Sequence, residues 1–281
     1  MAEKKLYIDE VYVIESLPSG ERRTGRELYE DLVIMAIAAN PPRQVHYKPL
    51  TTRQEFLGLL RAIAHDAQQG NHSPLLHIET HGCPDGIGLA SGEFLAWADF
   101  KQELTDINVI SNINLLVILA ACNGAHLLEV IQPTDRAPVR AVIGPDRTLK
   151  PSEIKVATLA FYRKLFETMD GVAAFHAMNE ACGQKTFSLH TADTIFLFLF
   201  RRYLRTMCTE EVIQQREQKA LADAPSRGYS GESLEQLRKA FRSVVCDYPA
   251  HFERLKHTFF SLRPPPREPR TLRPQIRTLS D

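Results

Sequence analysis

The sequence predicts an α/β fold, a three-layer α/β/α sandwich in which a mostly parallel sheet lies between two layers of helices. Three observations support this prediction. Short apolar runs typical of buried strands alternate along the chain with segments of helical periodicity. Several of these runs are almost entirely apolar, as in strands that are covered on both faces. Strands that are joined by a crossover helix lie parallel within one sheet.

Two strand–helix pairs are predicted before the centre of the chain. Tyr7–Ile14 is rich in β-branched and aromatic residues and predicts the first strand. Thr24–Glu27 has the spacing of a capping box, which predicts the start of a helix. A short strand is predicted at Val45–Lys48, and a second capping box at Thr52–Glu55 precedes another helix with one apolar face.

The centre of the chain contains two apolar runs that predict neighbouring parallel strands, Leu75–Thr80 and Leu115–Ala121. A helix between them is predicted by apolar residues at three- and four-residue spacing, namely Trp97, Phe100, Leu104 and Ile107. His81 follows the first strand and Cys122 follows the second. Because open α/β sheets build their sites at the carboxyl ends of parallel strands, we expect these two side chains to lie close together.

A cysteine beside a histidine is a pattern of nucleophilic catalysis, in which the imidazole takes the proton of the thiol. We expect a helix from Cys122 to about Ile131, and the positive end of a helix lowers the pKa of a cysteine. Gly82 has no side chain, so its N–H and that of Cys122 would form an oxyanion hole. Taken singly, Cys122 is interpreted as a buried apolar residue and His81 as a structural one. Their pairing at one sheet edge, with glycines beside both, favours the dyad.

These motifs are His81-Gly82 after one strand, an Asp85-Gly86 turn, and Ala121-Cys122 at the end of the next strand. Together they resemble the caspase-like cysteine peptidases, and among these the bacterial CHAT type, over roughly Leu75–Ala181. The stretch Ala120-Ala121-Cys122-Asn123-Gly124 departs from the narrower caspase pattern Gln-Ala-Cys-[Arg/Gln/Gly]-Gly. The resemblance implies a caspase-like fold and a cysteine endopeptidase that needs no metal or organic cofactor. It also implies a dedicated protein substrate, a bacterial defence or cell-death setting, and an activating or inhibiting protein partner.

Two segments are predicted to lie near the expected dyad. Turn signals on both sides of Ile87 and Leu89 predict a small β-hairpin that flanks the site. A strand at Ala141–Gly144 is followed by Asp146, which is expected at the same carboxyl edge. A carboxylate there would favour a basic residue before the scissile bond by charge pairing, and the alternative is a carboxylate that caps a loop or helix. Glu79 either orients the imidazole of His81 or has a solvated or structural role.

Other interpretations of the same residues stay open. A caspase-like scaffold or regulatory interaction module would keep the fold and the dyad without catalytic competence. Another cysteine-dependent activity, such as acyl transfer, would use the same nucleophile. A metal site is not indicated, since the spacings match none of the usual zinc patterns, and the residues considered are His77, His81, Cys83, Cys122 and His126.

Composition excludes several classes of protein. Lys+Arg and Asp+Glu both number 34, so no global field favours nucleic acid. Five scattered cysteines predict a reducing cytoplasm rather than a disulfide framework. The longest apolar run, Ile195–Phe200, is far too short to span a bilayer, and the N-terminus lacks the pattern of a signal peptide. We therefore expect a cytoplasmic protein that contacts neither a membrane nor nucleic acid directly.

The chain is expected to divide into three parts. Residues 1–207 form the caspase-like peptidase domain, which includes a long helix at Pro151–Met169 and a last strand at Phe187–His190. Residues 208–262 contain polar and amphipathic helices and form an appendage that packs on the core or binds a partner. Residues 263–281 carry five Pro and five Arg with few large apolar side chains, which predicts a flexible tail.

Overall fold

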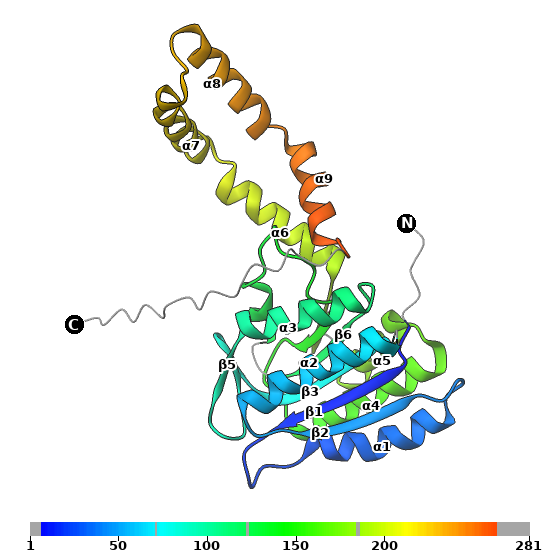
Figure 1. Cartoon of the computed structure of the whole chain (residues 1–281). Helices are drawn as coiled ribbons and strands as arrows, with labels where there is room; N and C mark the ends of the chain where they lie inside the picture. The colour runs from blue at the N-terminus through cyan, green and yellow to red at the C-terminus, as the bar shows by residue number, and fades with distance from the viewer. Residues whose placement is uncertain (1–6, 71, 122–123, 184–185, 263–281) are drawn as a thin grey trace, which may run out of the picture.

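The computed structural model has the α/β architecture that the sequence predicts, with helices on both faces of a mostly parallel sheet (Figure 1). It describes residues 7–70, 72–121, 124–183 and 186–262. The helices of the C-terminal part rise from one end of this sandwich. None of the helices in the described ranges is both long and apolar enough to cross a lipid bilayer.

Six strands of the described chain form the main path of the sheet, in the order β2-β1-β3-β6-β7-β8. The pairs from β2 to β7 are parallel, and β8 runs antiparallel to β7. The bounds of these strands are β1 Glu10–Ser16, β2 Gln44–Pro49, β3 Pro74–Cys83, β6 Leu116–Ala120, β7 Ala141–Pro145 and β8 Phe187–Thr191. Two short strands, β4 (Gly86–Gly88) and β5 (Phe94–Ala96), form the predicted hairpin, and β4 pairs with the end of β3.

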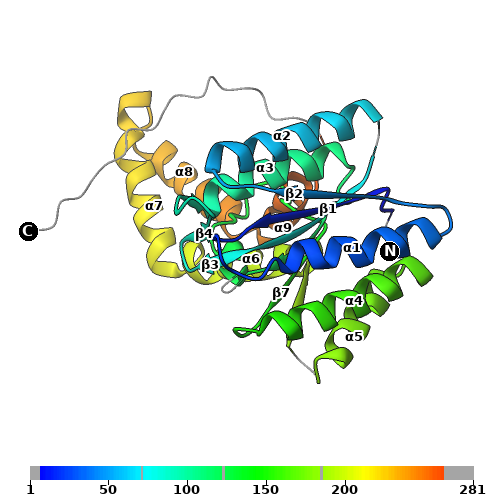
Figure 2. The same cartoon turned by 90° about the horizontal axis from the view of Figure 1, so that it is seen from below.

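Helices cover both faces of the sheet and complete the three layers (Figure 2). On one face lie α2 (Arg53–Gly70) and α3 (Trp97–Ile110), and on the other lie α1 (Thr24–Ala38), α4 (Pro151–Thr168) and α5 (Gly171–Ala181). Side chains of a strand alternate between these faces. Residues Tyr12 and Ile14 of β1 accordingly pack under α2, whereas Val11 and Val13 pack under α1 and α4. An apolar cluster on each face of the sheet thus holds the strands, and with them their carboxyl ends, in place.

Two predictions at helix starts are wrong. Thr24 does not cap α1, because Arg23 is the capping residue and the Thr24 hydroxyl bonds to a strand carboxylate instead. The helix expected from Cys122 to about Ile131 is only a short 3₁₀ turn, η1 (Gly124–Leu128), among the described residues. The second capping box is confirmed, since Thr52 and Glu55 exchange bonds between side chain and backbone.

Between β8 and residue 262 the chain forms four helices: α6 (Ala192–Met207), α7 (Glu210–Asp223), α8 (Glu232–Val245) and α9 (Tyr248–Phe259). A 3₁₀ turn, η2 (Pro225–Arg227), separates α7 from α8. We call α7 and α8 the arm, and Figure 1 shows the arm carried away from the sheet by α6 and α9. The helix over the apolar run after Thr191 is confirmed, and Thr191 caps it.

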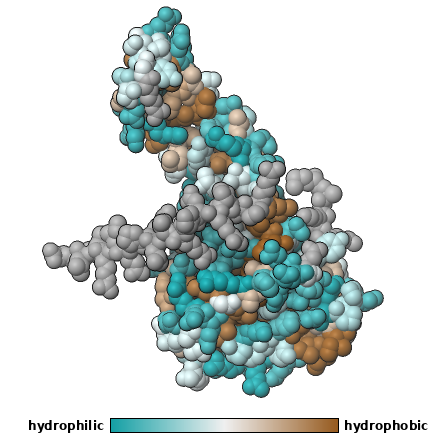
Figure 3. Space-filling view, in the orientation of Figure 1, coloured by the Kyte–Doolittle hydropathy of each residue, from teal (hydrophilic) through white to brown (hydrophobic). Residues whose placement is uncertain are grey.

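The base of α6 and α9 is anchored in the apolar cluster under α2 and α3. Phe196 and Phe259 are buried there with ring centroids 5.5 Å apart. The backbone carbonyl of Phe259 also accepts a hydrogen bond from the N–H of Ala137 at 2.8 Å. Apolar surface is visible where these helices meet the sandwich (Figure 3). The C-terminal helices are therefore fixed to the core at their base, although the arm itself extends beyond it.

Candidate functional site

His81 lies at the carboxyl end of β3, where the strand leaves the core. The strand is buried up to Thr80, and the His81 side chain is 59% exposed. In the antiparallel ladder with β4, His81 lies opposite Gly88 and Gly82 lies opposite Ile87. The Thr80 hydroxyl donates to the carbonyl of Gly88 at 2.5 Å, which ties the hairpin to the strand. The hairpin thus fixes the backbone from which His81 projects into solvent.

The second half of the predicted dyad, Cys122, lies outside the described residues together with Asn123. The backbone that leads to it is described. Strand β6 is the direct neighbour of β3, and Glu79 pairs with Ala120 in their parallel ladder. Ala121, the residue before Cys122, is buried. Glu79 and Ala120 are the last pair of the parallel ladder. His81 follows Glu79 by two residues, and Cys122 follows Ala120 by two residues in the sequence.

A carboxylate that was not predicted contacts His81. Glu21 lies in the loop between β1 and α1, and its two oxygens are 2.9 and 3.0 Å from Nε2 of His81. This loop reaches His81 because β1 is the other neighbour of β3, with Ser16 paired to Thr80. In the sequence, Glu21 is marked only by its position after a predicted strand. Its proximity to His81 depends on the pairing of β1 with β3.

Glu79, which the sequence offered as a partner for His81, bonds elsewhere. It is buried, accepts a hydrogen bond from the Thr24 hydroxyl at 2.9 Å, and lies 3.0 Å from Nε2 of His77. Its neighbour across the ladder, Glu15, is also buried and accepts from the backbone N–H of Gly25 at 2.8 Å. Both carboxylates thus lie at the start of α1, where unpaired N–H groups favour negative charge.

Two tyrosines share this buried polar cluster. The hydroxyl of Tyr47 donates to Glu15 at 2.6 Å, and burial together with that bond raises the pKa of Tyr47. Burial, with a smaller contribution from the charge of Glu79, raises the pKa of Tyr162 well above its ordinary value. Tyr162 packs on His77 with ring centroids 5.8 Å apart. The cluster fixes α1 and α4 to the sheet just beneath the end of β3.

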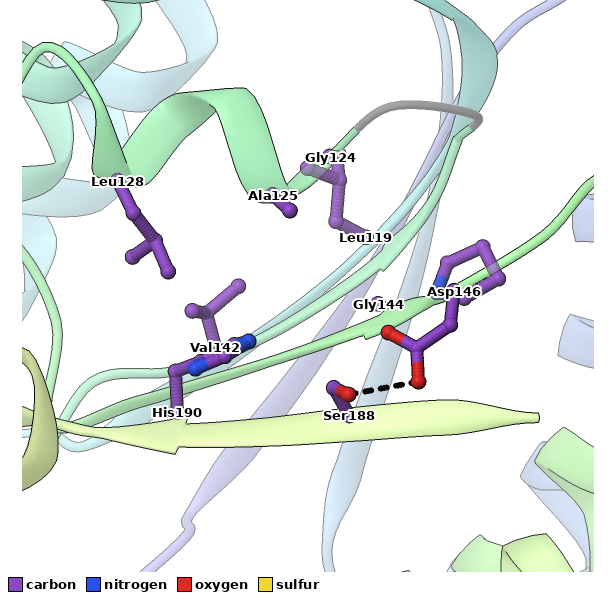
Figure 4. A pocket seen from close by; sticks show the side chains of 10 residues that line it. Leu119, Gly124, Ala125, Leu128, Val142, Gly144, Asp146, Ser188 and His190 are labelled. Atoms are coloured by element: carbon purple, nitrogen blue, oxygen red, sulfur yellow. Dashed lines mark hydrogen bonds between the residues drawn. The ribbon is translucent and has the colours of Figure 1, made fainter. Parts of the chain in front are cut away.

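Asp146 follows β7 and lines a small pocket at the same sheet edge (Figure 4). Its carboxylate accepts a hydrogen bond from the Ser188 hydroxyl at 2.7 Å. Gly124 and Ala125, the second and third residues after Cys122, line the same pocket, as does His190. Asp146 thus lies near the segment after β6, and Ser188 and His190, which line the same pocket, were not predicted.

The pocket combines apolar walls with three polar side chains, those of Asp146, Ser188 and His190. Leu119, Leu128 and Val142 form apolar walls, and the cavity has a volume of about 20 Å³. That volume holds about one water molecule. Burial lowers the pKa of His190, and the charge of Asp146 opposes this effect in part. The pocket is therefore small, and Asp146 is the one carboxylate among its described lining residues.

No group of three or more His, Cys, Asp or Glu side chains that could hold a metal ion is found among the residues that the structure describes. Of the residues considered for a metal site, Cys83 is a free thiol and its carbonyl accepts from the Trp97 indole at 3.2 Å. His126 lies in η1 and pairs with Glu129 at 3.2 Å.

Comparisons with known proteins give no functional assignment. No family model matches the chain, and no curated protein matches it. Solved structures that it matches include Raptor from Chaetomium thermophilum, with 10% sequence identity and a TM-score of 0.36. The match covers 63% of this chain and 20% of Raptor. A similarity this low carries no argument, so function is inferred from the geometry of the site.

Proposed function

We propose that this protein is a caspase-like cysteine endopeptidase of the CHAT type, with Cys122 as the nucleophile and His81 as the general base. The observation that carries the proposal is the register of β3 and β6. Glu79 pairs with Ala120, a spacing of 120 − 79 = 41 residues. His81 and Cys122 have the same spacing, 122 − 81 = 41. Neighbouring strands lie about 4.8 Å apart, so this register favours contact between the two side chains.

In the proposed reaction, the imidazole of His81 takes the proton of the Cys122 thiol and the thiolate attacks the scissile carbonyl carbon. The N–H groups of Gly82 and Cys122 would stabilise the negative oxygen of the tetrahedral intermediate. The imidazolium then returns the proton to the leaving amine, which leaves an acyl-enzyme. Water, deprotonated by His81, hydrolyses this thioester and regenerates the thiol. Because η1 has only five residues, a helix dipole adds little to this activation.

Asp146 is the proposed specificity residue, selecting a basic side chain before the scissile bond. Its carboxylate is held by Ser188 in a pocket that Gly124 and Ala125 also line, just after the nucleophile. Replacing Asp146 by Ala should reduce kcat/KM for an Arg-containing peptide by about tenfold or more, through loss of a charge-assisted hydrogen bond. Cleavage of the matching Ala-containing peptide should change little. Asp223→Ala, an exposed carboxylate on the arm, serves as the control.

The same proposal includes the biological system in which the enzyme acts and the way it is activated. The pocket beside Asp146 is small, and we propose that a protein partner activates the enzyme. We propose a cytoplasmic enzyme of a bacterial defence or cell-death system, acting on a dedicated protein substrate. Co-expression with proteins encoded beside it, followed by mapping of new chain termini, would identify the substrate.

Labelling with an electrophilic peptide tests the catalytic proposal. The purified full chain is incubated, with and without candidate partners, with a peptide acyloxymethyl ketone that carries Arg next to the warhead. We expect covalent attachment at Cys122, located by peptide mapping, and its loss in Cys122→Ala and His81→Ala. The exposed Cys246 provides an internal reference for a thiol without a base. Labelling of Cys122 that is unchanged in His81→Ala would reject the dyad and favour a scaffold.

A further inference from the structure

We infer that Glu21 is the positioning residue of this site, holding the imidazole of His81 in the orientation and tautomer that a general base requires. The inference rests on the proposed function. It is carried by the contact between Nε2 of His81 and both oxygens of Glu21, at 2.9 and 3.0 Å. The sequence shows no motif around Glu21, so the assignment comes from the fold alone.

The order of the strands relates the contact between Glu21 and His81 to the strand that precedes Cys122. Strand β3 lies between β1 and β6 in the parallel sheet. Glu21 comes from the loop after β1, His81 from the end of β3, and Cys122 follows β6. The carboxylate and the imidazole therefore come from neighbouring strands, and the strand that precedes Cys122 in the sequence is the next one in the sheet. A nucleophile, its base and a third group that orients the base are the usual components of an activated nucleophile.

The loop that carries Glu21 is anchored on both sides. The N–H of Glu21 donates to the carbonyl of Pro18 at 3.3 Å and closes a turn in which Gly20 has a φ of +93°. The guanidinium of Arg23 donates to the carbonyl of Leu17 at 2.8 Å. These contacts hold the loop backbone from which the Glu21 side chain extends to His81.

The ion pair of Glu21 and His81 is expected to contribute little to the stability of the fold. The side chains of His81 and Glu21 are 59% and 43% exposed. Exposed ion pairs of this kind contribute little to the free energy of unfolding, because water and salt screen them. Substitution of Glu21 should therefore leave folding intact, so that an effect on the thiol can be attributed to the site.

Bonding to Glu21 assigns distinct roles to the two ring nitrogens. The Nε2–H group donates to the carboxylate, which leaves the lone pair of Nδ1 free to take the thiol proton. When the S–H bond breaks and the Nδ1–H bond forms, the ring becomes an imidazolium whose charge Glu21 offsets. In Glu21→Gln the side-chain amide can donate to Nε2 instead, which selects the tautomer that cannot act as a base.

The first test measures the rate at which iodoacetamide alkylates Cys122, followed by peptide mass mapping of the full chain. We expect Glu21→Gln and Glu21→Ala to slow alkylation by about tenfold or more, and Glu21→Asp to recover part of the rate. The control Glu30→Gln, an exposed carboxylate on α1 that pairs with Arg26, should stay within about twofold of the parent. Melting temperatures of all variants should agree. An unchanged rate in both Glu21→Gln and Glu21→Ala overturns the inference.

The second test does not depend on the nucleophile. In a Cys122→Ala background, the ¹⁵N shifts of the neutral His81 ring should report the Nε2–H tautomer, and Glu21→Ala should convert this to a mixture. A mixture already present with Glu21 intact overturns the inference, whatever the alkylation rates. If His81→Ala slows alkylation and the Glu21 variants do not, the dyad stands and only the role of Glu21 is lost. If His81→Ala has no effect either, the proposed function is rejected with it.

Discussion

At the scale of single residues, the two buried carboxylates of β1 and β3 explain how α1 is fixed next to the site. Glu15 and Glu79 are neighbours across the ladder, and each accepts a bond from the first residues of α1. Gly25 allows this approach, because a Cβ atom there would lie 3.0 Å from Oε1 of Glu15 and 3.3 Å from Cγ of Glu79. The loop that holds Glu21 ends where this helix begins, so the buried cluster determines its position.

Removing Glu79 should destabilise the protein more than neutralising it. Glu79→Ala leaves the Thr24 hydroxyl and Nε2 of His77 buried without this partner, which should lower the free energy of unfolding by about 2–4 kcal/mol. Glu79→Gln keeps an acceptor and removes one of two adjacent negative charges, so we expect less than half of that loss. Urea denaturation measures both. As a control, Glu30→Ala at an exposed position should change the free energy of unfolding by less than about 0.5 kcal/mol. A loss as small as this in Glu79→Ala would contradict the structural role of Glu79.

Glu27 should make stability depend on pH in the acid range. Two bonds from Arg22 at 2.7 Å, aided by Lys155, lower the pKa of Glu27 from 4.5 to about 2. A folded-state pKa below the unfolded value adds stability that is complete above pH 4.5 and disappears as the pH falls towards 2. The side chain is partly exposed, so the contribution should not exceed about 1 kcal/mol.

Urea denaturation at about pH 5 and about pH 3 tests this linkage. The parent protein should lose more stability between these values than Glu27→Gln. In an Arg22→Gln background the difference should shrink, because the main cause of the pKa shift is gone. Equal acid dependence with and without Glu27 would show that the pair contributes nothing to folding.

At the scale of elements, the hairpin of β4 and β5 depends on one close backbone approach. A Cβ atom on Gly86 would lie 2.1 Å from the carbonyl oxygen of Leu95 and 2.9 Å from Cα of Ala96. Gly86→Ala must therefore push the two strands apart, at a cost of about 1–3 kcal/mol. On Gly88 the nearest atom to such a Cβ is 3.9 Å away, so Gly88→Ala is the matched control.

Because β4 also pairs with the end of β3, Gly86→Ala should increase hydrogen exchange at Gly82 and Cys83 as well as lowering the free energy of unfolding. Gly88→Ala should leave both nearly unchanged. Similar effects of the two substitutions would mean that the close approach does not hold the hairpin.

The elements that sequence patterns predicted well are those with a strong local signal. Trp97, Phe100, Leu104 and Ile107 are all fully or almost fully buried, as their spacing indicates. The exchanged bonds of the Thr52–Glu55 capping box depend only on residues within one turn. The same signal failed at Thr24, because a distant partner, Glu79, offered its hydroxyl a buried acceptor. The helix predicted after β6 was wrong as well, since the apolar residues there fill the core from a short 3₁₀ turn.

At the scale of the whole molecule, the candidate site is a property of strand order. The loops after β1 and β7 contribute Glu21 and Asp146, and the end of β3 contributes His81, to one edge of the sheet on both sides of the segment after β6. Sequence patterns predicted His81 and Asp146 at this edge, because each follows an apolar run that forms a parallel strand. They missed Glu21, because local periodicity does not determine that β1 lies beside β3. Long-range packing decides that order, and with it the surroundings of the imidazole.

The arm is held by few buried apolar side chains. In α7 and α8 of the described chain, the buried residues are Ile213, Glu217 and Val245. Arg242 joins the two helices by bonds to Glu217 at 3.0 Å and to Glu210 at 2.8 Å. A region with little apolar burial and with exposed ion pairs opens locally at low free energy. The arm should therefore open without unfolding of the sheet.

Hydrogen exchange followed by mass spectrometry tests this behaviour. Peptides from α7 and α8 should exchange well before those from β1, β3 and the base of α9, where Phe259 is fully buried. Arg242→Ala should speed exchange in both arm helices, because it removes the bonds that join α8 to Glu210 and to the buried Glu217 of α7 and leaves Glu217 paired with Arg238 alone, and should leave the sheet unchanged. Lys239→Ala, exposed on the same helix, is the control. If Arg242→Ala also sped exchange in β3, the arm would be part of the cooperative core, and a partner bound to it would act directly on the strand that carries His81.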